Sequence, residues 1–254
     1  MRGLIAAEWF KLTHNKTLPI LLALAAVFVV AQAEGSAFKN DVILGQFGVT
    51  LLSALSAFEV MLLVAFVGFF VTTEFDNGAV RNSLALGKNR LCLYLSKQVS
   101  VCVAIAALLL ASSLVATAVG TVRSGFGEMS AAAYAGFFLT IFGLHLLYHT
   151  VYAAFFTMIA FVTRNSILTV LLCVGVIVIE IMLVSLLGFS GEFGQTARTV
   201  FPVYSIKLLY STGDPAFFGY ADPAFLARSV IASAAEIALL IGIGAWAFKK
   251  AEIK

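Results

Sequence analysis

Long apolar runs and short polar connections alternate along the whole chain. A membrane-spanning helix needs about 20 largely apolar residues, because about 30 Å of hydrocarbon is crossed at about 1.5 Å per residue. Six runs approach or exceed that length: Leu18–Ala33, Val49–Thr72, Val99–Thr121, Ala131–Val162, Ile167–Gly188 and Ser229–Phe248. The pattern therefore predicts an all-α membrane protein with six transmembrane helices, in a single transmembrane domain covering residues 1–254.

Two other segments predict helices that do not cross the bilayer. In residues 1–14, Leu4, Ile5, Trp9 and Leu12 recur at helical spacing, which is typical of a helix lying in the membrane interface. Residues 189–228 form a long connection, and the stretch "TVFPVYSIKLLY" within it is too apolar for an ordinary loop. We expect external re-entrant helices there, before the last span.

The first apolar run also resembles a secretory signal with an A-x-A cleavage site at Ala31-Gln32-Ala33. The region before it is long, however, and contains Glu8, Trp9 and Phe10 in an amphipathic mixture. We therefore interpret the run as an uncut first span.

Composition and charge agree with a membrane protein. Of the 254 residues, 61% are hydrophobic and 11% are charged, far from the balance of a soluble domain. If both termini are cytoplasmic, most of the 16 Lys and Arg residues lie inside, which the positive-inside rule favours. The expected location is the plasma membrane, with residues 73–97 as the largest cytoplasmic loop. The sequence has no basic patch interleaved with aromatic residues, so we expect no nucleic-acid partner.

Several ionisable residues fall inside predicted spans, where they are costly and are candidate functional groups. Glu59, Glu180, His145 and His149 are candidates for a substrate path; Glu236 is nearer the outer half of its span. The alternative is that these carboxyl groups are protonated or bonded to neighbouring helices. No metal site is predicted, because HExxH is absent and Cys92, Cys102 and Cys173 lack ligand spacing.

The loop at 73–97 predicts a turn, a short helix, a second turn and re-entry into the membrane. Asn77-Gly78 is a turn dipeptide, residues 79–86 allow about two helical turns, and Gly87 is a natural stop. In the helix that follows, we expect Leu91, Tyr94 and Leu95 in lipid, and Arg90 and Lys97 near the headgroups. A helix this short is unstable alone in water, so it must rest on this protein or on a partner.

The stretch "EFDNGAVRNSLALGKNRLCLYLSK" resembles the cytoplasmic loop of ABC-2 type permeases, the membrane subunits of a class of ATP-driven exporters. "LIAAEWFKL" is similar to that family's N-terminal helix, "TRNS" to its fourth-to-fifth turn, and "TVFPVYSIKLLY" to its external re-entrant helices. The resemblance implies that residues 73–97 form a coupling loop, whose short coupling helix docks on a separate ATPase subunit. The residues it assigns to docking are Glu74, Phe75, Asp76, Asn77, Gly78, Val80, Arg81, Asn82 and Leu84.

The resemblance also implies a complex. Two P-loop ATPase subunits would bind ATP and Mg²⁺, and this chain would pair with a second permease chain, either identical or related. The chain has no GxxxxGK[ST] motif and needs no cofactor of its own, so we expect it to be a non-catalytic subunit. Its size is similar to permeases of peptide-antibiotic export and immunity, and a hydrophobic cleft suits an antimicrobial peptide, a drug or a lipid.

Two other functions remain alternatives. A stand-alone ion- or proton-coupled transporter would use the intramembrane Glu and His residues, but the chain shows no symmetry between inverted halves. An intramembrane enzyme would need a convergent catalytic set, which the spacing does not indicate.

Overall fold

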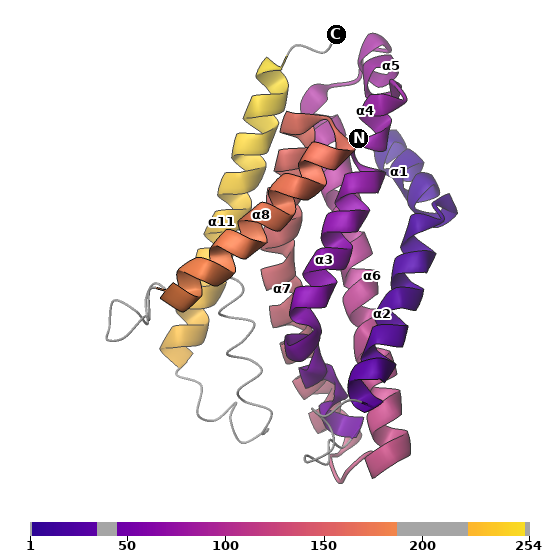
Figure 1. Ribbon diagram of the computed structural model, residues 1–254, viewed down its shortest axis with the longest axis vertical. Coiled ribbons are helices and arrows are strands. Elements are labelled where there is room, and N and C mark those ends of the chain that lie inside the picture. Colours follow the sequence, from indigo (N-terminus) through magenta and orange to yellow (C-terminus); the bar gives the residue numbers. More distant parts are fainter. Residues whose placement is uncertain (1, 35–44, 187–222, 252–254) are drawn as a thin grey trace.

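In the computed structural model of the protein, which describes residues 2–34, 45–186 and 223–251, the chain folds into helices and those residues include no strand. The helices lie roughly along one long axis (Figure 1). Their bounds are α1 (Arg2–His14), α2 (Thr17–Glu34), the 3₁₀ helix η2 (Gly45–Thr50), α3 (Leu51–Phe70), α4 (Thr73–Asp76), α5 (Ala79–Ala85), α6 (Arg90–Ser124), α7 (Ala131–Thr163), α8 (Ser166–Leu186) and α11 (Pro223–Lys250).

Five helical segments of the described chain are long and apolar enough to cross a membrane, namely those containing α3, α6, α7, α8 and α11. Helix α2 qualifies only together with α1, from which it is bent by 54°. The all-α membrane fold is thus confirmed, with five spans, or six if the bent pair counts as one. Most of the segment at 189–228, where re-entrant helices are expected, lies outside the described residues.

Helices α3, α6 and α7 form the centre of the bundle. Within the most apolar stretch of each span, 67% of the α3 residues and 61% of the α7 residues are buried, against 22% for α8 and 11% for α11. Phe66, Ile105 and Phe156 are fully buried where the three central helices meet. Helices α8 and α11 instead present apolar side chains outward, as expected of surfaces that face lipid tails.

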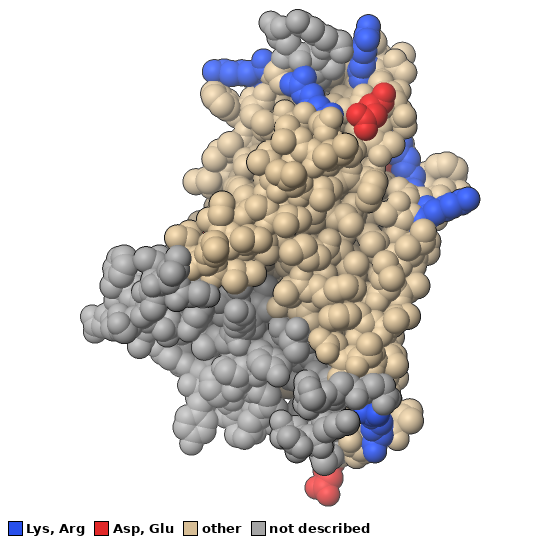
Figure 2. Space-filling model, viewed as in Figure 1, with Lys and Arg blue, Asp and Glu red and all other residues tan. Residues whose placement is uncertain are grey.

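Charged side chains on the visible face lie near the two ends of the molecule, and an uncharged band separates them (Figure 2). Helix α5 projects at one of these ends (Figure 1). The band is where the apolar spans run, so the membrane crosses the bundle there.

Helix α6 starts where the sequence predicted that the chain re-enters the membrane. It begins at Arg90, where the Asn89 side chain caps it by accepting a hydrogen bond from Leu91 N at 2.9 Å. Its 35 residues extend for about 52 Å, well beyond a hydrocarbon core of about 30 Å. Tyr94 was expected in lipid and Lys97 near the headgroups. Both side chains are instead buried, because α1, α4 and α11 surround this end of α6.

Candidate functional site: the coupling loop and its buried ion pairs

The loop between α3 and α6 consists of two short helices joined by the predicted Asn77-Gly78 turn. Gly78 has φ of 68°, in the left-handed region that glycine adopts without strain. Helix α4 continues almost directly from α3, and α5 packs mainly against α4. The loop therefore places α5 at the end of the molecule (Figure 1).

Part of the residue set assigned to docking points into the protein. The Phe75 ring lies edge-on to Phe161, with ring centroids 5.2 Å apart. Val80 is 2% exposed, and Leu84 packs against the same core. These residues, together with Glu74, fix the loop to the bundle.

The other part of the set faces outward. Asp76, Asn77, Arg81 and Asn82 are exposed, and Leu86 just beyond α5 is 79% exposed. An apolar side chain exposed on a short charged helix is available for contact with another protein.

Four charged side chains meet beneath the loop. The Lys97 ammonium of α6 lies 2.5 Å from Glu74 Oε1 and 2.6 Å from Glu8 Oε2. Lys11 of α1 bridges the same two carboxylates, at 2.8 Å from Glu74 and 2.9 Å from Glu8. The Lys97 side chain is 1% exposed, and its Nζ lies 4.3 Å from the centre of the Phe70 ring. Two lysines and two glutamates, neutral in sum, thus join α1, α4 and α6.

Charge neutrality explains how this group tolerates burial. An isolated buried ammonium is strongly disfavoured, whereas one with two carboxylates and an aromatic face retains most of its stabilisation. Burial lowers the pKa of Lys11, but hydrogen bonds and charge from Glu74 and Glu8 outweigh it and raise the pKa above its ordinary value. Lys11 therefore stays charged at neutral pH.

Arg90 forms a second link at this end of the molecule. Its Nη1 donates to the carbonyl oxygens of Phe248, Lys249 and Ala251, at 3.2, 3.1 and 2.6 Å. These carbonyls end α11, where a cation offsets the helix dipole. Arg90 thus fastens the start of α6 to the end of α11.

The intramembrane candidates fall into two separate places. Glu59 of α3 and His149 of α7 lie together in the buried centre, with His149 Nε2 3.7 Å from Glu59 Oε2. His145 lies one turn away on α7, with its ring centroid 6.0 Å from that of His149. Ser112 of α6 also faces the Glu59 carboxyl. Among the described residues, no three His, Cys, Asp or Glu side chains form a group that could hold a metal ion.

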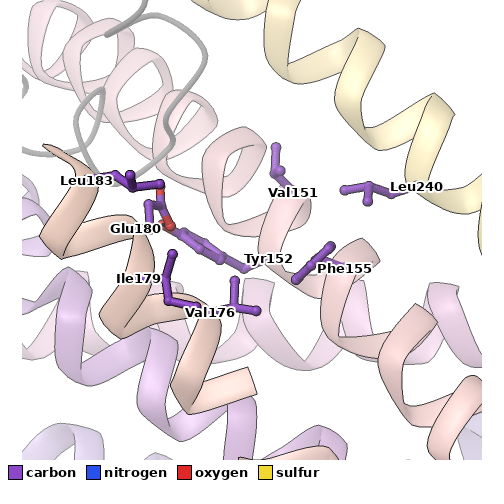
Figure 3. A pocket seen from close by; sticks show the side chains of 8 residues that line it. All are labelled: Val151, Tyr152, Phe155, Val176, Ile179, Glu180, Leu183 and Leu240. Atoms are coloured by element: carbon purple, nitrogen blue, oxygen red, sulfur yellow. Dashed lines mark hydrogen bonds between the residues drawn. The ribbon is translucent and has the colours of Figure 1, made fainter. Parts of the chain in front are cut away.

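Glu180 belongs to a different feature, a pocket of about 260 Å³ between α7, α8 and α11 (Figure 3). Its Oε2 accepts a hydrogen bond from Tyr152 Oη at 2.7 Å. The other lining side chains are apolar: Val151, Phe155, Val176, Ile179, Leu183 and Leu240. Glu236 of α11 is near enough to interact electrostatically with Glu180. The pocket pairs an apolar wall with a carboxyl group.

Sequence reasoning missed the joining role of Glu8, Lys11 and Lys97. Glu8 and Lys11 are three apart, which suggests an ordinary surface pair on one helix face. Lys97 lies about two helical turns after the start of α6, a position that suggests a headgroup anchor. One signal was available, because serine and glutamine flank Lys97, and a lipid-facing turn would favour apolar residues there.

Comparison with known proteins agrees with this architecture. No curated protein sequence matches the chain. The family model of ABC-2 family transporter proteins matches residues 4–189, which is well over half of the 254 residues and runs from α1 through the coupling loop to the end of α8. The chain therefore belongs to the ABC-2 transporter family.

Proposed function

We propose that this protein is the membrane subunit of an ATP-driven exporter, in which α5 docks on a separate P-loop ATPase. Two ATPase subunits bind ATP and Mg²⁺, and two permease chains, identical or related, enclose the substrate path. Helix α5 and both termini lie on the cytoplasmic side of the plasma membrane. The chain itself catalyses no reaction.

The observation that carries this proposal is the outward face of α5. Arg81 and Asn82 are exposed on a seven-residue helix. So short a helix is not stable by itself, yet here it is held in place by buried contacts of Val80 and by the ion pairs of Glu74. A surface that is exposed and rigidly placed suits docking, because little conformational entropy is lost on binding.

The ion pairs beneath the loop supply a route for transmitting force. Glu74 contacts Lys97 of α6 and Lys11 of α1, so displacement of the loop by a partner would move both helices. Packed elements with fixed contacts move as units rather than deforming continuously. Closure of the ATPase pair would thereby reach the spans.

The substrate that fits the pocket between α7, α8 and α11 is amphipathic. Aliphatic and aromatic side chains suit an acyl chain or apolar side chains, and Glu180 suits a cationic or hydrogen-bonding group. An antimicrobial peptide, an amphiphilic drug and a lipid share this chemistry.

The test is Arg81→Glu in the chain co-expressed with its partner P-loop ATPase. We expect the variant to insert normally but to lose most ATPase co-purification and substrate-stimulated hydrolysis. Lys88→Glu is the matched control, since it reverses an exposed charge in the same loop outside α5. Unchanged co-purification and unchanged stimulation with Arg81→Glu would overturn docking through α5.

A further inference from the structure

Glu59 and His149 face one another across the contact between α3 and α7. Their side chains are 1% and 0% exposed, and 3.7 Å separates Glu59 Oε2 from His149 Nε2. Neither carboxyl oxygen of Glu59 has a hydrogen-bond partner, and neither does His149 Nε2. Unpaired polar atoms at such depth are costly, so this arrangement calls for a chemical explanation.

The tautomer of His149 is fixed by its other ring nitrogen. Nδ1 lies 2.8 Å from the backbone oxygen of His145. A carbonyl oxygen only accepts, so Nδ1 carries a hydrogen and donates it. In the neutral ring, Nε2 is then a bare acceptor, and it points toward Glu59.

An ionised Glu59 is also only an acceptor. Ionised Glu59 and neutral His149 would therefore direct two lone pairs at each other in an apolar interior. The conflict disappears when one proton is added. That proton gives either a carboxylic acid beside a neutral imidazole or a carboxylate beside an imidazolium, and both states have the same total charge of zero.

We propose that Glu59 and His149 form a proton-binding site that holds one shared proton at the contact between α3 and α7. Losing the proton leaves a net charge of −1 in the centre of the bundle, and gaining a second leaves +1. Both charged states are penalised by burial, so the singly protonated pair is the stable one. The titration belongs to the pair rather than to either residue.

The other polar groups around the pair do not remove the conflict between the lone pairs of Glu59 and His149. Helix α6 contributes the Ser112 hydroxyl, and α7 contributes His145, which is ionisable. Helix α8 also packs on α3, and the carboxylate it carries, Glu180, is bonded to Tyr152. From α2 and η2, the described side chains that pack on α3 include no charged group.

The site has a mechanical consequence. Helix α3 leads into α4, which carries Glu74, so the proton pins the helix that continues into the coupling loop. Raising the pH until the proton leaves would turn an attractive α3–α7 contact into a repulsive one. The contact should then weaken under alkaline conditions.

The experiment measures thermal unfolding of the purified full chain in lipid nanodiscs from neutral to alkaline pH. It needs no ATPase, so it can fail while the exporter assignment stands, and the reverse also holds. In Glu59→Gln, an amide N–H can donate to Nε2 without titrating. We expect the wild-type Tm to fall by roughly 3 °C or more, relative to Glu59→Gln, as pH rises.

Glu128→Gln is the control, since it removes an exposed carboxyl that lies outside the helices, and it should keep the wild-type pH profile. Parallel profiles for wild type and Glu59→Gln would overturn the proposal. If Glu59→Gln does not fold, wild-type protein labelled with ¹⁵N-histidine and ¹³C-glutamate decides the question. A neutral His149 ring together with an ionised Glu59 carboxyl at neutral pH would then contradict a shared proton.

Discussion

Lys97 of α6 and Glu74 of α4 form an ion pair at 2.5 Å, with 1% of the lysine side chain and 15% of the glutamate side chain exposed. Glu8 approaches the same ammonium from α1 at 2.6 Å. The coupling loop, the N-terminal helix and a central span thus share one cation. The first predictions concern this joint.

Replacing Lys97 with methionine should strongly destabilise the protein. The change keeps most of the side-chain volume but leaves Glu8 and Glu74 facing each other, with only the half-exposed Lys11 between them. Removing one partner of a buried ion pair costs about 3–5 kcal/mol. Thermal unfolding in nanodiscs measures the loss, and Lys88→Met, at an exposed site, should stay within about 0.5 kcal/mol of wild type. Equal stability of the two variants would show that the joint is unimportant for folding.

Glu74→Gln should affect coupling more than folding. Lys97 and Lys11 keep Glu8 as a partner, so we expect a stability loss of about 1–3 kcal/mol, smaller than for Lys97→Met. The ATPase should still bind through α5, but its hydrolysis should respond less to substrate. Asp76→Asn removes the neighbouring exposed carboxylate and serves as control. Normal stimulation in Glu74→Gln would exclude this pair as the transmitting contact.

Val80 and Leu86 should separate anchoring from docking. Val80 is 2% exposed, so Val80→Ala should cost about 1–3 kcal/mol of stability. Leu86 is 79% exposed, so Leu86→Ser should leave thermal unfolding unchanged and weaken ATPase binding in a pull-down titration. A Leu86→Ser variant with wild-type ATPase affinity would place the docking surface elsewhere on the loop.

Two glycines that lie two residues apart on α11 offer a packing test. A Cβ at Gly244 would lie 2.2 Å from Tyr94 Oη and 2.7 Å from Cζ, whereas one at Gly242 would meet nothing within 4 Å. The Tyr94 ring is fully buried, so Gly244→Ala should destabilise by about 1–3 kcal/mol through overpacking. Gly242→Ala should be neutral or should stabilise by up to about 1 kcal/mol. Equal unfolding midpoints for Gly244→Ala and Gly242→Ala would refute close packing of α11 on α6.

Filling the pocket between α7, α8 and α11 should inhibit transport. Leu183 lines the pocket, while Met182 beside it is 57% exposed and does not. Leu183→Trp should therefore reduce export of amphipathic substrates in proteoliposomes, and Met182→Trp should not. Equal transport by both variants would remove the pocket from the substrate path.

Sequence reasoning located the helices well, because length and hydropathy alone decide what a bilayer accepts. The run expected at Ala131–Val162 is helix α7 at Ala131–Thr163, one residue longer. Helix α6 begins at Arg90, nine residues before the apolar run at Val99, in the stretch where a helix was expected to re-enter the membrane. What was wrong is the surroundings of its first turns, which are shielded by other helices rather than by lipid.

The candidate site was predictable only in part. The turn at Asn77-Gly78 and the short helix after it follow from local chemistry. Which side of the loop is buried does not, because Phe75 looks as available as Arg81 until α7 and α11 are placed beside it. Pairing of Lys97 with Glu8 joins residues far apart in the chain, and nothing local encodes it.

The outward docking face of the coupling loop and its buried contacts with the bundle should also differ in their response to salt. Mobile ions screen charges over about 10 Å at 0.1 M and about 3 Å at 1 M, and they act on exposed charges far more than on buried ones. Arg81 lies in reach of them, while the Lys97 ammonium is enclosed by protein. Concentrated salt should therefore dissociate a docked partner from the membrane subunit while the loop keeps its contacts with the bundle. The partner can then rebind when the salt is diluted.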